Sequence, residues 1–390
     1  MTRINGTFRF FPIGQGLFYG GHIMSGDSSF TFVYDCGTEE RWKPFLDREI
    51  ASFQNFPLVY GAVTQLDLAV VSHLHSDHFC GVYDLIQQVG KPRRIILPLI
   101  EGDSLVKEII LYGIFSDTAY EITYNVVPFF MQLYAEARNY GEIRERRERI
   151  VSFRMRNKEN FDEKTEAIVS SNSPLVANLE SLSGETIWRF SLLRGSTGRN
   201  KPSIIDDIRV EIQSLLCSAG CLNIEQYISE KGAKGFEMIR DIYKKHGFKA
   251  SSTENNTSTI MLHYPLIGNR RLHYWQNAPR RGFTFYESAA TLLTGDSTIN
   301  KEQAKLLQDL MIEAEPCFFV TQLPHHGAES SFRAVLSYLW SYIVRGLAVV
   351  SYGTGNSYQH PSALAVSSFS AGQLVFVNEH HPFTYHLSFD

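Results

Sequence analysis

The amino-acid sequence predicts an α/β fold in which strands and helices alternate, interrupted by a helical segment. Residues 66–72 (LDLAVVS) are an apolar run of the kind expected from a strand buried on both faces. Residues 81–88 then predict the start of a helix, and residues 94–99 predict another strand. Strand and helix in this alternating order indicate the α/β class.

The elements on either side of this region also follow strand patterns. At the N-terminus, residues 8–13 predict a strand, residues 14–16 (GQG) a turn, and residues 30–34 a second strand that leads into Asp35-Cys36-Gly37. From residue 257 onward, short apolar runs recur between turns, and they read TSTIMLHY, TLLTGD, CFFVTQLPHHG, LAVVSYG and LVFVNEHH. We therefore expect both ends of the chain to contribute strands.

The middle of the chain has a different pattern. Residues 103–250 combine helical apolar spacing with dense charge, including a run of six charged residues at 144–149. Residues 184–193 and 208–216 are candidates for strands that return to the core. The predicted organisation is one α/β domain in two halves, residues 1–102 and 251–390, separated by a mainly helical insertion at 103–250.

Composition restricts the classes of function. The chain has 390 residues and a net charge of −4, so no overall basic field attracts nucleic acid, and any such site must be a local patch. The first residues lack the apolar core of a signal peptide, and no run reaches the roughly 18 to 20 apolar residues that span a bilayer. We expect a cytoplasmic protein with no membrane partner. Its five scattered cysteines predict reduced thiols.

A dense cluster of metal-binding residue types follows the apolar run at 66–72. It contains His73, His75, Asp77 and His78 within six residues. Two histidines at i and i+2 can converge on one metal ion from a loop, and the Asp-His pair can address a second ion nearby. Imidazole and carboxylate together suit Zn²⁺, Mn²⁺ or Fe²⁺. A rigid strand before the cluster would hold these ligands in fixed positions.

Three later patterns place similar residues at the ends of predicted strands. Asp296 ends TLLTGD, His325 and His326 lie in LPHHG, and His360 lies in NSYQHP. Alone, a Gly-Asp pair is typical of an ordinary turn.

The pattern H-x-H-x-D-H after an apolar strand resembles the hallmark of the metallo-β-lactamase superfamily. The resemblance implies an αββα sandwich with metal ions at one edge between two sheets, and Asp296 as the ligand that bridges them. The GQG, DCG, LTGD, HHG and N-x-Y-x-HP patterns are similar to the branch typified by the nuclease domain of ComEC-type competence proteins, over residues 8–100 and 255–380. Two departures are Leu17, where the branch has Asp, and Ala328, where it has Ser.

The resemblance also implies the ligands of two divalent ions, Zn²⁺ or Mn²⁺. Its ligand set is His73, His75, Asp77, His78, Asp296, His325 and His360. Either His325 or His326 could face the metals; we expect His325, with the other contacting substrate or orienting a ligand. His246, His263 and His273 are expected at the surface or in the core, and His380, His381 and His386 are expected at the surface or in strands.

The implied reaction is hydrolysis by a hydroxide between the two metal ions, with Asp77 orienting it and His325 and His326 also in the catalytic group. The ComEC-like resemblance favours nucleic acid, DNA or RNA, as the substrate. A local basic and aromatic segment supplies candidate substrate contacts, namely Arg270, Arg271, Trp275, Arg280 and Arg281. The same segment is equally consistent with a hairpin bearing solubilising charges.

Two other functions remain open at this level. One is a small-molecule hydrolase, such as a lactonase or a cyclic-nucleotide phosphodiesterase, because the metal ligands alone do not determine which type of bond is cleaved. The other is a module controlled by a partner protein, since stand-alone members of the branch resemble effectors of prokaryotic defence systems. An open basic groove would favour the nuclease, and a lidded apolar pocket would favour the small-molecule enzyme.

Overall fold

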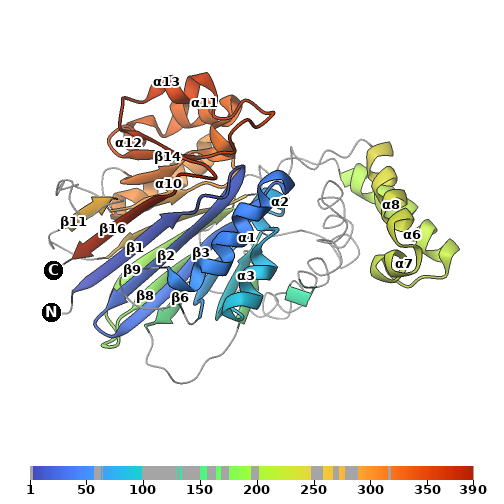
Figure 1. Ribbon diagram of the computed structural model, residues 1–390, viewed down its shortest axis with the longest axis horizontal. Helices are drawn as coiled ribbons and strands as arrows, with labels where there is room; N and C mark the ends of the chain where they lie inside the picture. The colour runs from blue at the N-terminus through green and yellow to red at the C-terminus, as the bar shows by residue number, and fades with distance from the viewer. Residues whose placement is uncertain are drawn as a thin grey trace.

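The computed structural model is a sandwich of two β-sheets with helices on both outer faces (Figure 1). The described residues are 3–56, 63, 65–98, 129, 132–133, 150–155, 164–167, 175–194, 202–246, 258–266, 272–276, 289–314 and 318–389.

The first sheet contains both chain ends. In spatial order its strands are β11 (Leu272–Gln276), β16 (Phe383–Phe389), β1 (Ile4–Phe10), β2 (Gly16–Ser25), β3 (Ser28–Thr38), β4 (Leu68–Val70), β5 (Arg94–Leu97) and β7 (Lys164–Ala167). Pairing is antiparallel from β11 to β3 and parallel from β3 to β7.

The second sheet is built from the later part of the chain. Its order is β15 (Leu374–Val377), β14 (Leu347–Ser351), β13 (Val320–Gln322), β12 (Thr291–Leu293), β10 (Thr259–Pro265), β9 (Thr186–Arg194), β8 (Leu175–Glu180) and β6 (Ile150–Arg154). The four strands from β12 to β15 are parallel, so their C-terminal ends lie at one edge.

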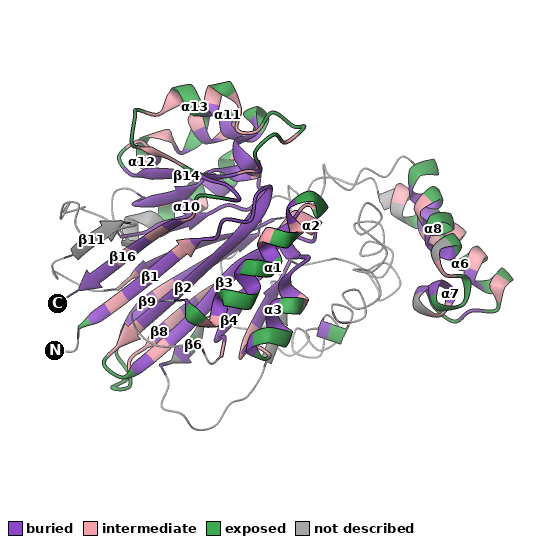
Figure 2. Ribbon diagram, in the orientation of Figure 1, coloured by how far each residue is buried: buried purple, intermediate pink, exposed green. Residues whose placement is uncertain are grey.

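Alternation along each strand creates the layers of the sandwich. In β4, Leu68 and Val70 belong to the core between the sheets, and Ala69 belongs to the core beneath the helices of the first sheet. Those helices are α1 (Lys43–Ser52) and α3 (Val82–Val89). The second sheet is covered by α10 (Lys301–Ala314), α11 (Glu329–Tyr338), α12 (Trp340–Ile343) and α13 (Ala363–Ser368). Figure 2 shows that the strands are mostly buried. The predicted αββα sandwich is confirmed.

The described part of the predicted insertion at 103–250 contains strands as well as helices. Strands β6 to β9 lie within this segment and belong to the two main sheets. Of these, only β9 corresponds to a predicted strand, the one at residues 184–193. The predicted strand at 208–216 is wrong, because these residues lie in α6 (Pro202–Ala219). Ile208, Ile212 and Leu216 are buried at four-residue spacing, which is the period of a helix rather than a strand.

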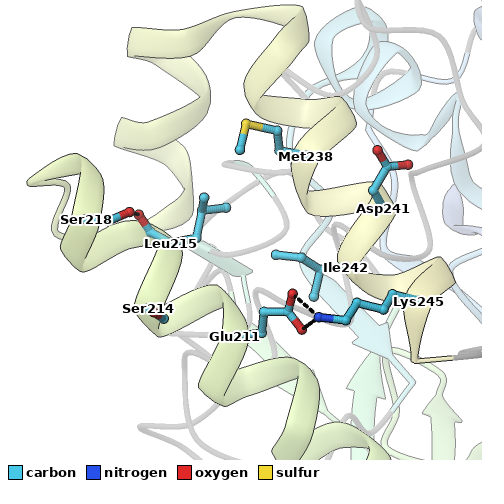
Figure 3. A pocket seen from close by; sticks show the side chains of 8 residues that line it. All are labelled: Glu211, Ser214, Leu215, Ser218, Met238, Asp241, Ile242 and Lys245. Atoms are coloured by element: carbon cyan, nitrogen blue, oxygen red, sulfur yellow. Dashed lines mark hydrogen bonds and ion pairs between the residues drawn. The ribbon is translucent and has the colours of Figure 1, made fainter.

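Helix α6 forms a three-helix unit with α7 (Ile224–Lys231) and α8 (Ala233–Lys245), drawn to one side of the sandwich in Figure 1. A cavity of about 460 Å³ opens between α6 and α8, with Leu215, Met238 and Ile242 among its lining residues (Figure 3). Lys245 Nζ crosses it to reach the Glu211 carboxylate at 2.7 and 2.9 Å. No helix among the described residues is long and apolar enough to cross a membrane.

Candidate metal centre

Strand ends from both sheets meet at one edge of the sandwich. In the first sheet, β4 ends at Val70 and leads into residues 73–78, which include the short helix α2 (Ser76–Phe79). In the second sheet, β12, β13 and β14 lead into Asp296, residues 324–327 and residues 352–361, respectively. The amide of Thr259 donates to the Ser72 carbonyl at 2.8 Å and so ties the sheets together at this edge. Segments far apart in sequence therefore deliver side chains to one place.

The metal-binding residue types at this edge form two overlapping groups. One group contains Asp77, His78, Asp296 and His326, and the other contains His73, His75 and Asp77. Within each group, the potential ligand atoms lie within 4.8 Å of one another. That spacing is compatible with donor atoms about 2 Å from a shared ion. Asp77 belongs to both groups, so the two clusters are contiguous.

The buried carboxylate of Asp296 faces histidines on both of its oxygens. Its Oδ1 lies 3.0 Å from His78 Nε2 and 4.0 Å from His326 Nε2. Its Oδ2 lies 3.8 Å from His73 Nε2 and also 3.8 Å from His325 Nε2. The side chain is only 2% exposed. Each oxygen is thus directed at a separate pair of imidazole nitrogens.

Asp35 orients His78 directly and His73 through Ser72. Its carboxylate accepts hydrogen bonds from the amide and the hydroxyl of Ser72, both at 2.6 Å, and from His78 Nδ1 at 2.8 Å. The Ser72 hydroxyl, having donated to Asp35, can accept from His73 Nδ1 at 2.9 Å. In both histidines Nδ1 therefore carries a proton, and Nε2 points into the centre.

The HHG segment turns sharply and separates its two histidines. His325 and His326 have φ values of 49° and 52°, in the left-handed region that side chains other than glycine rarely adopt. His326 is 3% exposed, donates from Nδ1 to the Ser351 carbonyl at 2.8 Å, and places Nε2 3.1 Å from Asp77 Oδ2. His325 is 33% exposed and approaches Asp296 from the other side. Backbone strain of this kind is characteristic of functional sites.

Two glycines allow the segments to approach closely. A Cβ on Gly295 would lie 2.9 Å from Ser72 Oγ and 3.1 Å from Tyr34 Oη, and its φ of 53° also favours glycine. A Cβ on Gly37 would lie 2.4 Å from the Ser76 carbonyl of α2. The Gly-Asp and Asp-Cys-Gly patterns therefore have a steric basis, since a larger residue at either position would displace the ligand loops.

Charge is concentrated and buried at this edge. Burial alone would lower the pKa of His78, but the carboxylates of Asp296, Asp77 and Asp35 outweigh it and raise the pKa well above its ordinary value. Burial would raise the pKa of Asp296, whereas the neighbouring histidines, His78 above all, hold it well below its ordinary range. Burial lowers the pKa of His73, and His78 and His75 lower it further. The carboxylates of Asp77 and Asp296 thus remain ionised.

The donor set fits divalent metal ions. His78 Nε2 and Asp296 Oδ1 are buried 3.0 Å apart, and among the described residues neither atom makes a well-aligned hydrogen bond. Leaving such atoms buried without partners is costly, so their mutual approach is best explained by a shared cation. Imidazole nitrogens with carboxylate oxygens, and histidines oriented by Asp35 and a backbone carbonyl, are typical of such centres.

Not every residue expected in the site is placed there. His360 lies outside both groups, with its ring centroid 5.4 Å from that of His325 and 6.2 Å from that of His326. Arg270, Arg271, Arg280 and Arg281 lie outside the described residues. Trp275 is on edge strand β11, five strand spacings or about 24 Å from β4. The backbone therefore does not bring Trp275 to the centre.

Several residues at this edge had no prediction attached to them individually. Asp35 belongs to the DCG pattern, which by itself assigns this residue no role, and Ser72 and the Ser351 carbonyl carry no sequence signal of their own. Glu39 is half-buried beside the centre; burial and the nearby Asp77 carboxylate raise its pKa, and the Tyr358 hydroxyl opposes this shift. His263, considered among the extra histidines, is buried between the sheets, as expected for a core residue.

The profile of the family described as the metallo-beta-lactamase superfamily matches residues 25–101, which include the histidine cluster. No curated protein matches the chain. The chain is similar to the metallo-beta-lactamase fold protein YhfI from Bacillus subtilis, at 9% identity over 98% of this chain and 100% of that one, with a TM-score of 0.39. It is also similar to MEM-A1, a subclass B3 metallo-beta-lactamase from a soil metagenome library, at 13% identity over 62% and 94%, with a TM-score of 0.19.

Together, the matched profile, the sandwich and the His/Asp cluster define a protein of the metallo-β-lactamase fold with a candidate metal-binding site. Members of this superfamily are mostly metal-dependent hydrolases.

Proposed function

We propose that this protein is a two-metal hydrolase that cleaves phosphodiester bonds of nucleic acid. The observation that carries the two-metal part is the placement of Asp296, whose oxygens face different histidine pairs at 3.0 to 4.0 Å. A carboxylate with both oxygens engaged in this manner suits a ligand shared by two ions.

The geometry supports a division of the ligands between two subsites. His73, His75 and Asp296 Oδ2 would hold one ion, with His325 as a further ligand. Asp77, His78, Asp296 Oδ1 and His326 would hold the other. This proposal adds His326 and keeps His325 from the sequence prediction, because His325 Nε2 lies 3.8 Å from Asp296 Oδ2 although His325 is outside both groups. It assigns His360, which is also outside both groups, to the substrate side.

When bound, two divalent ions supply a water of lowered pKa and polarise a phosphoryl oxygen. The protein's own residues keep the ligand lone pairs aligned: Asp35 fixes His78 directly and fixes His73 through Ser72. Asp77 lies at the junction of the two groups, where its carboxylate can also orient the water. Nitrogen-rich ligands with carboxylates suit Zn²⁺, and Mn²⁺ is the alternative.

The choice of nucleic acid rests on two further observations. The sequence patterns around the centre resemble the ComEC-type nuclease branch, and the described rim of the centre is open to solvent at His325 and Tyr358. An open rim admits a polymer, whereas a small-molecule pocket is more enclosed. The same resemblance extends the proposal to an effector nuclease restrained by a partner protein.

Cleavage assays on metal-loaded protein test this function. The protein, stripped by chelator and reloaded with Zn²⁺ or Mn²⁺, is incubated with plasmid, linear, single-stranded DNA and RNA, and with a lactone, a cyclic nucleotide and a simple ester. Asp296→Asn should abolish cleavage, and Asp47→Asn, an exposed residue on α1, is the matched control. Hydrolysis of the lactone or cyclic nucleotide alone would replace the nuclease by a small-molecule hydrolase.

A further inference from the structure

A stack of three rings leads from the metal centre to the surface. The ring of Tyr358 lies over that of His360 with centroids 5.7 Å apart and planes inclined by 25°. His360 in turn lies over His326, at 6.2 Å and 26°. His326 is 3% exposed and belongs to the candidate metal group, whereas Tyr358 is 58% exposed. The outermost ring of the stack is thus a large aromatic presented to solvent beside the centre.

The loop that carries this ring is held by a set of side-chain hydrogen bonds. The Asn356 side chain accepts from the amides of Tyr358 and His360, at 3.1 and 3.0 Å. It also donates to the carbonyls of Gly353 and His360, at 2.9 and 2.7 Å. These four bonds fix the loop without help from the Tyr358 ring.

Two further anchors connect the loop to the sandwich. Gln15, buried in the GQG turn, accepts from the Gly353 amide at 3.1 Å. The Glu379 carboxylate accepts from the Thr354 amide at 3.1 Å and from its hydroxyl. The loop that carries Tyr358 is therefore pre-organised, as a binding site requires.

The Tyr358 hydroxyl also interacts with the Glu39 carboxylate, just after β3, and this contact lowers the pKa of Glu39 against the raising effect of burial. A ring that is stacked on one side and mostly exposed contributes little buried apolar area to the fold. These features favour a binding role for the ring over a packing role.

We propose that Tyr358 is a substrate-binding platform, which stacks against the nucleobase next to the phosphodiester at the metal centre. This inference rests on the proposed function. Every base has a flat aromatic face, so such a platform tolerates any sequence, and the stack with His360 keeps the ring at a fixed angle to the centre. Tyr358 acts in binding, and it is not a ligand of the metals.

The test compares two small phosphodiesters with the same leaving group on metal-loaded, full-length protein. Thymidine 5′-(4-nitrophenyl phosphate) carries a base, and methyl 4-nitrophenyl phosphate does not. Tyr358→Ala should raise KM for the thymidine diester by at least about fivefold, the lower end for loss of one base–aromatic stack, and leave kcat nearly unchanged. The methyl diester should be hydrolysed as by the wild type, and metal content should be unaltered.

Two variants serve as controls. Tyr358→Phe keeps the ring and removes the hydroxyl, so it should retain most of the preference for the thymidine diester. Tyr338→Ala removes an exposed tyrosine at the far end of α11 and should behave as the wild type does. Equal losses on both diesters in Tyr358→Ala would indicate damage to the centre and would overturn the platform, as would wild-type kinetics on both.

A binding measurement separates this inference from the proposed function. Fluorescence anisotropy with chelator-treated protein and a labelled single-stranded oligonucleotide should give a Kd at least about fivefold weaker for Tyr358→Ala. An abasic site placed at the position of stacking should weaken wild-type binding and have no added effect in the variant. If the wild type cleaves nothing yet binds in a Tyr358-dependent manner, only the nuclease activity fails. Absent binding, or binding that ignores Tyr358, refutes the platform.

Discussion

Acid should destabilise this fold through one buried histidine, His263, which lies on β10 between the sheets. The Trp188 indole N–H donates to its Nδ1 at 3.3 Å, so its Nε2 must carry the proton and donate to the Tyr19 hydroxyl at 2.9 Å. A second proton would bring Nδ1–H against the indole N–H. Burial accordingly lowers the pKa of His263 from 6.5 to about 3.

The sign and size of the effect follow from this depressed pKa. The neutral form is favoured in the folded state, so the stabilisation is complete above pH 6.5 and is lost as the pH falls toward 3. At about 1.4 kcal/mol per pH unit below the unfolded pKa, lowering the pH from 7 to 5 should reduce the free energy of unfolding by about 2 kcal/mol through this residue.

His263→Gln isolates the contribution, because an amide can accept from Trp188 and donate to Tyr19 but does not titrate. Equilibrium urea unfolding with chelator present, followed by tryptophan fluorescence, gives the free energy for each protein at several pH values. The advantage of the wild type should shrink by about 2 kcal/mol between pH 7 and pH 5. His380→Gln, at an exposed position, should parallel the wild type. Parallel curves for the wild type and His263→Gln would refute the reasoning.

Three further outcomes are expected at the centre. Asp35→Asn places an amide N–H opposite the Ser72 hydroxyl and His78 Nδ1, which are already donors. Metal affinity, measured by competition with a chromogenic chelator, should therefore fall about 10- to 100-fold. Unchanged affinity would show that Asp35 does not orient the ligands. His325→Ala and His326→Ala should each weaken the binding of one ion and leave the binding of the other unchanged, and the control His380→Ala should bind both ions. Loss of both ions from either variant would contradict separate subsites. Gln15→Ala should raise KM more than it changes metal content, because it releases the loop at 352–361; an unaltered KM would show that the loop does not need this anchor.

The sequence was most informative where the chemistry is local. Six consecutive residues contain four of the candidate ligands, and the apolar run before them is the buried β4. Asp296 could be found because it follows a strand and comes in the right order. The α/β class could be predicted from the alternating strands and helices, whereas the αββα layering was implied only by the family resemblance.

The parts that could not be predicted depend on tertiary contacts. Which of two adjacent histidines joins the tight group is decided by left-handed backbone at both and by the Ser351 carbonyl that fixes His326. Strand β8 has no clear sequence signal, because polar residues alternate with apolar ones in this half-buried strand. In 208–216 a short apolar pattern fitted both a strand and a helix, and only its four-residue burial spacing resolves the ambiguity.

The two-metal centre is the claim on which the proposed function depends, and metal stoichiometry tests it most directly. The full-length protein is stripped with chelator, reloaded with Zn²⁺ or with Mn²⁺, freed of excess ion and measured by elemental analysis. The wild type should hold about two equivalents per chain, and Asp296→Asn should hold markedly less, because both subsites share this carboxylate. Less than about half an equivalent in the reloaded wild type, or full occupancy in Asp296→Asn, would contradict the two-metal centre.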